Sequence, residues 1–282
     1  MTELLVIANQ TLAGHKLLDE IRSRAAQGDV HVRIVVPMTK PSAGLVIYDD
    51  AVRDATQVRV DLALSVLAAE GVRASGEVGD PDPYSAVHDA IGAHGRPDEI
   101  IISTKPAESS GWLRRDLIEK VSSSSGVPVT HIVSDLDQEG LPFNVTLVVA
   151  NRTSSGEELL ERLVAKAAND QEHLFIGVVP QQSGHGASSH DARDRLNAML
   201  DRLHGAGLLA SGMIGDPDPY TAVLNALQLF RVNDVVISTL PDERSGWLRS
   251  NLIERVQKAT KARVEHVVVS DDAAATTTTA GN

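Results

Sequence analysis

Two polar segments occur twice in the sequence, and their residue types suit the binding of an anion or a nucleotide. The letters GDPDPY stand at 79–84 and again at 215–220. The letters SGWLR stand at 110–114 and again at 245–249, each a few residues after a Ser-Thr-x-Pro run. Hydroxyls, free backbone N–H groups at a helix start and a guanidinium hold phosphate or another small anion, whereas a carboxylate receives a ribose hydroxyl.

A third repeated feature follows the first apolar run of each half, where Ala-Asn-x-Thr stands at 8–11 and again at 150–153. Together the repeated segments give the candidate ligand-binding set. In the first half these residues are Asn9, Thr11, Asp80, Ser103, Thr104, Ser110, Gly111 and Arg114. In the second half they are Asn151, Thr153, Asp216, Ser238, Thr239, Ser245, Gly246 and Arg249.

Each segment also has a purely structural interpretation. Asp82 and Pro83 are typical of a helix N-cap and first turn, which leaves Asp80 to receive a hydroxyl or to pair with an arginine. Ser110 can cap a helix while Trp112 packs on the sheet, or the same helix start and Arg114 can hold an anion. The sequence leaves both alternatives open.

Catalytic and metal chemistry find little support. Among ten histidines only His131 and His266 recur in register, each within an apolar run, where a structural role is commoner than metal ligation. There is no Cys, which excludes thiolate nucleophiles, disulfides and Cys-ligated zinc. No Gly-x-Gly-x-x-Gly loop is present. We therefore expect a protein that is not an enzyme and has no metal site, and its cofactor, if any, stays unknown.

Composition narrows the class of partner. Lys and Arg number 26 against 38 Asp and Glu, a net charge of −12 that disfavours nucleic acid and anionic membranes. Apolar runs such as 145–150 are far shorter than the roughly 18 residues that span a bilayer. The first residues lack a basic region and a small-residue cleavage site, so we expect a cytoplasmic protein.

The repeats extend over the whole chain, which is a tandem duplication of an α/β domain. Five short apolar runs in the first half, near 4–8, 31–36, 72–78, 99–102 and 129–133, alternate with helical patterns near 14–27, 51–70, 83–94 and 112–123. Runs apolar on both faces, each followed by a helix, predict a doubly wound parallel sheet. The second half predicts strands near 145–150, 173–179, 208–214, 234–238 and 264–269.

Four regions follow from this pattern. We predict a first domain over 1–136, a linker over 137–144, a second domain over 145–270 and a disordered tail over 271–282. The tail is Ala- and Thr-rich with nothing to bury. The polar insert 37–50, matched by 181–190, is where the halves differ most.

The sequence resembles the universal stress protein family over nearly the whole chain. The likeness rests on a polar residue after the first strand (Asn9, Asn151), Gly-Asp-Pro before the third helix, and Leu-Ile-Glu-x-Val in the fourth helix. The Ser-Thr-x-Pro and Trp-Leu-Arg runs resemble a tandem subgroup of actinobacterial type. The resemblance implies five-stranded sheets of order 3-2-1-4-5 and an internal pseudo-dimer, or a homodimer, that meets through the last strands near His131 and His266.

Departures from the family's ATP-binding pattern bear on function. Family members that bind ATP carry an acid after the first strand and then Gly-x-x-Gly, a spacer and Gly-Ser/Thr after the fourth. Here Asn9 replaces the acid, Pro106 ends the run that replaces Gly-x-x-Gly, and Asp116 stands near the Gly-Ser position. Proline offers no N–H to phosphate, and a carboxylate repels it.

We therefore expect a non-enzymatic protein of stress response or regulation with degenerate nucleotide- or anion-binding clefts. The alternatives are an ATP- or AMP-binding universal stress protein and a pure protein-interaction scaffold.

Overall fold

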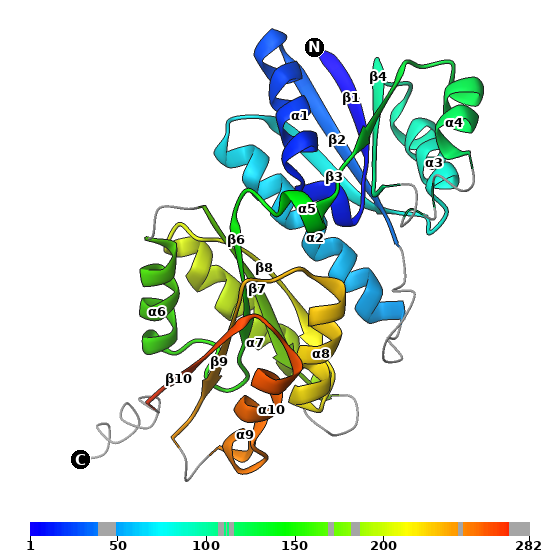
Figure 1. Ribbon diagram of the computed structural model, residues 1–282. Helices are drawn as coiled ribbons and strands as arrows, with labels where there is room; N and C mark the ends of the chain where they lie inside the picture. Colours follow the sequence, from blue (N-terminus) through cyan, green and yellow to red (C-terminus); the bar gives the residue numbers. More distant parts are fainter. Residues whose placement is uncertain are drawn as a thin grey trace. The chain divides into compact units, whose positions relative to one another are not determined.

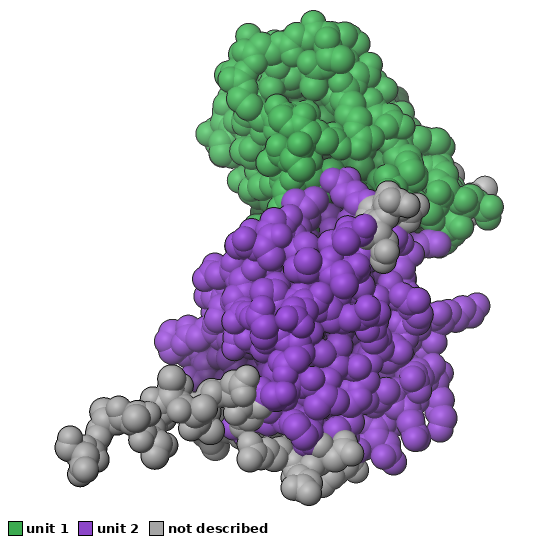
Figure 2. Space-filling view, turned by 90° about the vertical axis from the view of Figure 1, so that its left-hand side faces the viewer, with its two compact units in different colours: residues 1–143 green, residues 144–282 purple. Residues whose placement is uncertain are grey.

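The structure is a computed structural model in which residues 1–38, 49–106, 110, 112, 116–168, 172–181, 187–241 and 245–270 are described. The predicted tail 271–282 and most of the insert 37–50 lie outside these residues. The chain forms two compact units, residues 1–143 and 144–282, coloured separately in Figure 2. No described helix is long and apolar enough to cross a membrane.

Unit 1 is a parallel sheet of strand order β3-β2-β1-β4-β5 with helices on both faces (Figure 1). Its elements are β1 (Thr2–Ile7), the 3₁₀ helix η1 (Gln10–Ala13), α1 (His15–Gln27), β2 (Val30–Pro37), α2 (Asp49–Ala69), β3 (Arg73–Gly79), α3 (Pro83–His94), β4 (Glu99–Thr104), α4 (Leu117–Ser125), β5 (Val129–Val133) and α5 (Leu136–Glu139). The four-residue helix α5 begins one residue before the predicted linker 137–144 and ends within it.

Unit 2 repeats this arrangement with strand order β8-β7-β6-β9-β10. Its elements are β6 (Asn144–Val149), α6 (Glu157–Ala167), β7 (His173–Pro180), α7 (Ala187–Gly205), β8 (Leu209–Gly215), α8 (Pro219–Leu229), β9 (Asp234–Thr239), α9 (Gly246–Arg249), α10 (Leu252–Ala259) and β10 (Arg263–Val268). The predicted fold class, two doubly wound α/β sheets of order 3-2-1-4-5, is confirmed.

Burial on both faces explains why the strands form where apolar runs stand. In unit 1, Leu5, Ile7 and Val35 pack with residues of α3 and α4 on one face of the sheet. In unit 2, Val148 and Phe175 pack with residues of α6 and α7 on the corresponding opposite face. A central strand with helices on each side must be apolar at nearly every position.

Helix α4 of unit 1 begins later than the predicted fourth helix. The pattern placed a helix near 112–123, but α4 begins at Leu117, after Asp116 in the left-handed region at φ 51°. Asn251 has the same geometry at φ 52° and separates α9 from α10 in unit 2. A residue in the left-handed region interrupts a helix. The apolar spacing of the sequence continues across that residue, so a prediction from spacing alone begins the helix too early.

One glycine shows how closely helix and sheet approach. Gly212 of β8 lies in register with Gly177 of β7. A Cβ on Gly212 would lie 2.7 Å from the Gly177 carbonyl oxygen and 2.6 Å from Leu196 Cδ1 of α7. Because the first of these neighbours is backbone, the sheet itself would have to shift to accept a side chain.

We expect Gly212→Ala to lower the free energy of unfolding of unit 2 by about 1–3 kcal/mol through overpacking. Gly205→Ala, at the end of α7, is the control because a Cβ there meets nothing within 4 Å. Urea unfolding followed by circular dichroism measures both variants. Equal stability of the two would contradict the packing that the structure shows.

Candidate functional site

The candidate residues after the first and fourth strands meet at one edge of each sheet. β1 lies between β2 and β4, and β6 lies between β7 and β9, so strand order reverses on either side of the first strand of each unit. In open parallel sheets, ligands bind beyond the carboxyl ends of the strands at such a reversal. Asn9 and Thr11 follow β1, and Ser103 and Thr104 end β4.

A buried hydrogen bond joins these two strand ends. Thr11 Oγ1 donates to the Ser103 carbonyl oxygen at 3.1 Å. In unit 2, Thr153 Oγ1 donates to the Ser238 carbonyl oxygen at the same distance. All four residues are at least 97% buried. The bond fixes the turn after the first strand against the end of the fourth, and the duplication has kept it.

Among the described residues, polar atoms of this turn and of the adjoining end of the fourth strand have no hydrogen-bond partner. Asn9 Nδ2 donates to the Pro37 carbonyl oxygen at 2.6 Å, but the buried Oδ1 of Asn9 accepts nothing. Ser103 Oγ, 1% exposed as a residue, also has no partner. In unit 2, Asn151 Oδ1 and Ser238 Oγ are likewise buried and without partners.

Unpartnered buried polar atoms are rare because each one forfeits its hydrogen bond to water. The same two kinds of atom, an asparagine Oδ1 and a serine Oγ, lack partners at matching positions of both units, so a packing fault at one position does not explain them. Such atoms at a strand-order reversal fit groups reserved for a water or a ligand. The sequence predicted these residues as site members, and the structure brings Asn9, Thr11, Ser103 and Thr104 into neighbouring positions.

A threonine–histidine pair lies beside the site in each unit. Thr104 Oγ1 and His131 Nε2 are 2.9 Å apart, and Thr239 Oγ1 and His266 Nε2 are 2.8 Å apart. Each pair joins the fourth strand to the edge strand, β5 or β10. Sequence reasoning noted both histidines and both threonines but missed the pairs. Their identical separation of 27 residues in both halves was the available signal.

The Gly-Asp-Pro-Asp-Pro segment begins a helix, which is the structural interpretation of its sequence. Asp82 Oδ2 accepts a hydrogen bond from Ser85 N at 3.1 Å, as the N-cap of α3. Asp80 Oδ1 accepts from Asp82 N at 2.8 Å in a tight turn. Asp218 and Asp216 make the same bonds in unit 2. Asp80 and Asp216 follow the outer strands β3 and β8, which are separated from the fourth strand of each sheet by β2 and β1 or by β7 and β6.

The second repeated segment is only partly described. Ser110 is 5% exposed, and Trp112 packs against the core beneath α3 and α4. Gly111 and Arg114 lie outside the described residues. In unit 2, Ser245 Oγ accepts from Leu248 N as the N-cap of α9, which confirms its capping role. Gly246 is exposed, and the side chain of Arg249 lies outside the described part of the chain. The residues that Ser110 would cap, 111 and 113–115, lie outside the described residues, and the N-cap residue of α4 is Asp116.

No protein-family model and no curated protein sequence matches the chain. Solved structures do match. A universal stress protein from Archaeoglobus fulgidus is similar at 16% identity and a TM-score of 0.35, with 96% of this chain and 97% of that chain covered. A Pseudomonas aeruginosa structure that bears the same family name matches at 14% identity and a TM-score of 0.30, with 96% and 93% covered. A P. aeruginosa protein of unknown function matches at 13% and 0.31, with 95% and 93% covered.

Two of these structures have titles that name the universal stress protein family. The resemblance of this chain to that family rests on the motifs described above. The narrower resemblance to an actinobacterial tandem subgroup stays a prediction.

We expect the hydroxyls of Thr11 and Ser103 to differ in their effect on stability. Thr11→Val removes the donor to a buried carbonyl and should lower the free energy of unfolding by about 1–2 kcal/mol. Ser103→Ala removes an unpartnered hydroxyl and should leave this free energy unchanged or raise it. Thr153→Val and Ser238→Ala repeat the comparison in unit 2. Denaturant unfolding decides, and a large loss in Ser103→Ala would show that its hydroxyl has a protein partner.

The stability of unit 1 should depend on the protonation of His131. Burial lowers the pKa of the His131 imidazole from its ordinary value of 6.5. The unfolded chain therefore binds a proton more readily than the folded protein, so this contribution is complete above pH 6.5 and is lost as the pH falls from 6.5 through the lowered pKa of the folded state. His131→Gln should flatten the pH dependence of unfolding, whereas His190→Gln, at an imidazole with an 81% exposed side chain, should not. An unchanged slope in His131→Gln would refute this origin.

Proposed function

We propose that the chain is a two-domain protein of the universal stress type that acts in a stress response or its regulation and catalyses no reaction. Its clefts at the β1–β4 and β6–β9 junctions are degenerate nucleotide- or anion-binding sites. The observation that carries this proposal is the repeated set of unpartnered buried atoms, Asn9 Oδ1, Ser103 Oγ, Asn151 Oδ1 and Ser238 Oγ.

The chemistry of these atoms favours a small ligand with both donors and acceptors. An amide oxygen can only accept a hydrogen bond, so it calls for an N–H or O–H on the ligand, whereas a serine hydroxyl can also donate. The base or the ribose of a nucleotide offers such groups, and so does a protonated oxyanion or a water. The atoms lie within the fold, so a ligand that reaches them would displace bound water or open the turn.

The surroundings disfavour a triphosphate. Pro106 and Pro241 stand after the fourth strands and have no N–H to give a phosphate oxygen. The amino end of α4 would attract a phosphate group through the helix dipole. Asp116, an exposed acid with φ 51°, occupies that end, and its carboxylate would repel the phosphate. The left-handed conformation of Asp116 and Asn251 is one that glycine adopts readily, in keeping with their alignment to the family's glycine position.

A second candidate function, a protein-interaction scaffold, is favoured by the edge strands. Val133 at the end of β5 is 39% exposed, and Val268 at the end of β10 is 46% exposed. β5 and β10 are the edge strands of their sheets, and an edge strand presents one row of backbone N–H and C=O groups that its own sheet does not pair. Pairing of universal-stress-type domains, within this chain or between two copies, would cover these edges.

Titration calorimetry with AMP, cyclic AMP, ATP and sulfate tests the proposal. We expect heat from AMP, cyclic AMP or sulfate, and weaker or absent heat from ATP because the site repels the added phosphates. Ser103→Ala combined with Ser238→Ala should reduce the heat by the share that these two clefts contribute. Ser122→Ala, on the exposed face of α4, should retain it.

Tighter binding of ATP than of AMP would favour the ATP-binding alternative and overturn degeneracy. Absence of heat from all four ligands would leave the scaffold as the remaining function. Hydrolysis of ATP by the purified protein, reduced in Asp80→Ala, would contradict the non-enzymatic assignment.

A further inference from the structure

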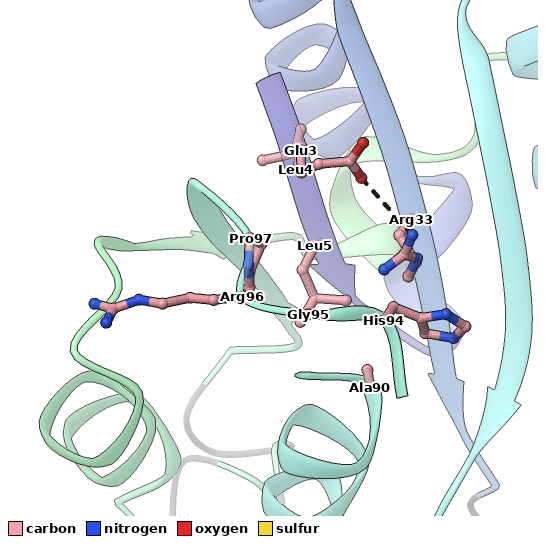
Figure 3. A pocket seen from close by; sticks show the side chains of 9 residues that line it. All are labelled: Glu3, Leu4, Leu5, Arg33, Ala90, His94, Gly95, Arg96 and Pro97. Carbon is pink, nitrogen blue, oxygen red and sulfur yellow. Dashed lines mark ion pairs between the residues drawn. The ribbon is translucent and has the colours of Figure 1, made fainter. Parts of the chain in front are cut away.

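A second polar cluster of unit 1 extends from the start of β1 to the middle of β2 and to Glu77 of β3. A pocket opens there between the start of β1, the middle of β2 and the segment that follows α3 (Figure 3). Glu3 and Arg33 lie on one side of it, His94 on another, and Leu5 and Ala90 give it apolar surface. None of these residues belongs to the site described above.

Two carboxylates of the cluster each have an imidazole partner. His31 Nδ1 lies 2.9 Å from Glu3 Oε2, and His94 Nε2 lies 3.1 Å from Glu77 Oε1. These pairs reduce the demand of both carboxylates for another cation. The pairs come from β1, β2, β3 and the last residue of α3, so the cluster spans three neighbouring strands.

Arg33 is the cation of this pocket whose guanidinium N–H groups have no hydrogen-bond acceptor among the described residues. Its Nη2 lies 3.7 Å from Glu3 Oε2, longer than a hydrogen bond, and the part of the chain that the structure describes offers it no hydrogen bond. Its side chain is 22% exposed. Figure 3 shows Arg33 between Glu3 and His94, whereas Arg96 extends away from Arg33 and donates to the Gly126 carbonyl oxygen.

Unit 2 shows that the fold does not need this cluster. The strand registers align the two units residue by residue. The pair Glu3 and His31 of unit 1 corresponds to the pair Val145 and Leu174 of unit 2. The pair Pro37 and Gly79 corresponds in the same way to Pro180 and Gly215. In this alignment, five ionisable residues of unit 1 occupy positions that are apolar in unit 2. Glu3, His31, Arg33, Glu77 and His94 correspond to Val145, Leu174, Ile176, Met213 and Phe230.

The apolar version packs well. Val145 is 4% exposed, and Leu174, Ile176 and Met213 are each 2% exposed. Apolar residues at such positions stabilise a fold at least as well as half-buried ion pairs, which lose hydration and gain modest Coulomb energy. A donor-rich pocket confined to one copy of a duplicated fold therefore points to binding rather than to folding.

We propose that the Arg33 pocket of unit 1 binds a small oxyanion, the carboxylate or phosphate group of a ligand. The planar guanidinium presents two parallel N–H groups that match two oxygens of either group. Leu5 and Ala90, each 3% exposed, line the buried side of the pocket, and His94 also lines it. Unit 2 has no counterpart because Ile176 replaces Arg33.

The residues of unit 2 supply the test variants. In the full-length protein, we expect acetate or inorganic phosphate to shift the Arg33 Nε–Hε resonance in ¹⁵N-correlated NMR spectra. Arg33→Ile, which installs the residue of unit 2, should weaken anion binding by at least about tenfold. Arg73→Leu is the matched control, because it too exchanges an arginine for its unit 2 counterpart, Leu209, at an exposed position outside the pocket.

The two anions distinguish the sources. A response to acetate alone identifies a carboxylate ligand, and a response to phosphate alone identifies a phosphate ligand. If Arg33→Ile does not fold, Arg33→Gln replaces it, with the same loss expected. An Arg33 resonance that neither anion moves, or full binding in the variant, would overturn the proposal. Ser103→Ala and Ser238→Ala should leave this binding intact, which separates it from the proposed nucleotide or anion clefts.

Discussion

The hydrogen bond from the turn after the first strand to the end of the fourth is the constraint on which the candidate site depends. It is buried in both units, and without it a strand-end carbonyl would be unpaired in a medium where that loss is large. Because Thr11 holds the turn in place, Asn9 is held with its Nδ2 on the Pro37 carbonyl and its Oδ1 unpartnered. The open hydrogen-bonding capacity of the site is thus a consequence of a rigid junction.

The duplication serves as an internal comparison between what the fold requires and what each copy adds. At the carboxyl ends of the strands, the Thr–Ser bond, the Thr–His pair and the Asp caps recur with nearly equal distances. Around Arg33, unit 1 has an ionisable cluster where unit 2 has apolar residues. The strand-end contacts are thus common to both copies, whereas the Arg33 cluster is particular to unit 1.

Much of the fold was predictable because it depends on burial and local caps. The strands start and end within two residues of the predicted runs, since a two-sided parallel sheet leaves few polar positions. Helix α3 matches its predicted bounds because Asp82 and Pro83 specify its start. The start of α4 was wrong because Asp116 departs to left-handed backbone, which no periodicity records.

Of the predicted site residues, Asn9, Thr11 and Ser103 lie at neighbouring strand ends, but their hydrogen bonds could not be predicted from the sequence. Which atom of Asn9 is bonded, and that Ser103 Oγ is not, depend on side-chain geometry that spacing cannot supply. The Arg33 cluster escaped the sequence because single charges within strands look like solvated positions. It becomes visible only when strand registers align the two units.

The central claim, that the fourth-strand loops no longer hold a triphosphate, is tested most directly by a crystal structure determined from crystals grown with excess ATP. The account predicts no ordered triphosphate after β4 or β9, with any density confined to a base, a ribose or a single oxyanion beside Asn9 and Ser103 or their counterparts. Three ordered phosphates bound by backbone N–H groups after either strand would contradict it.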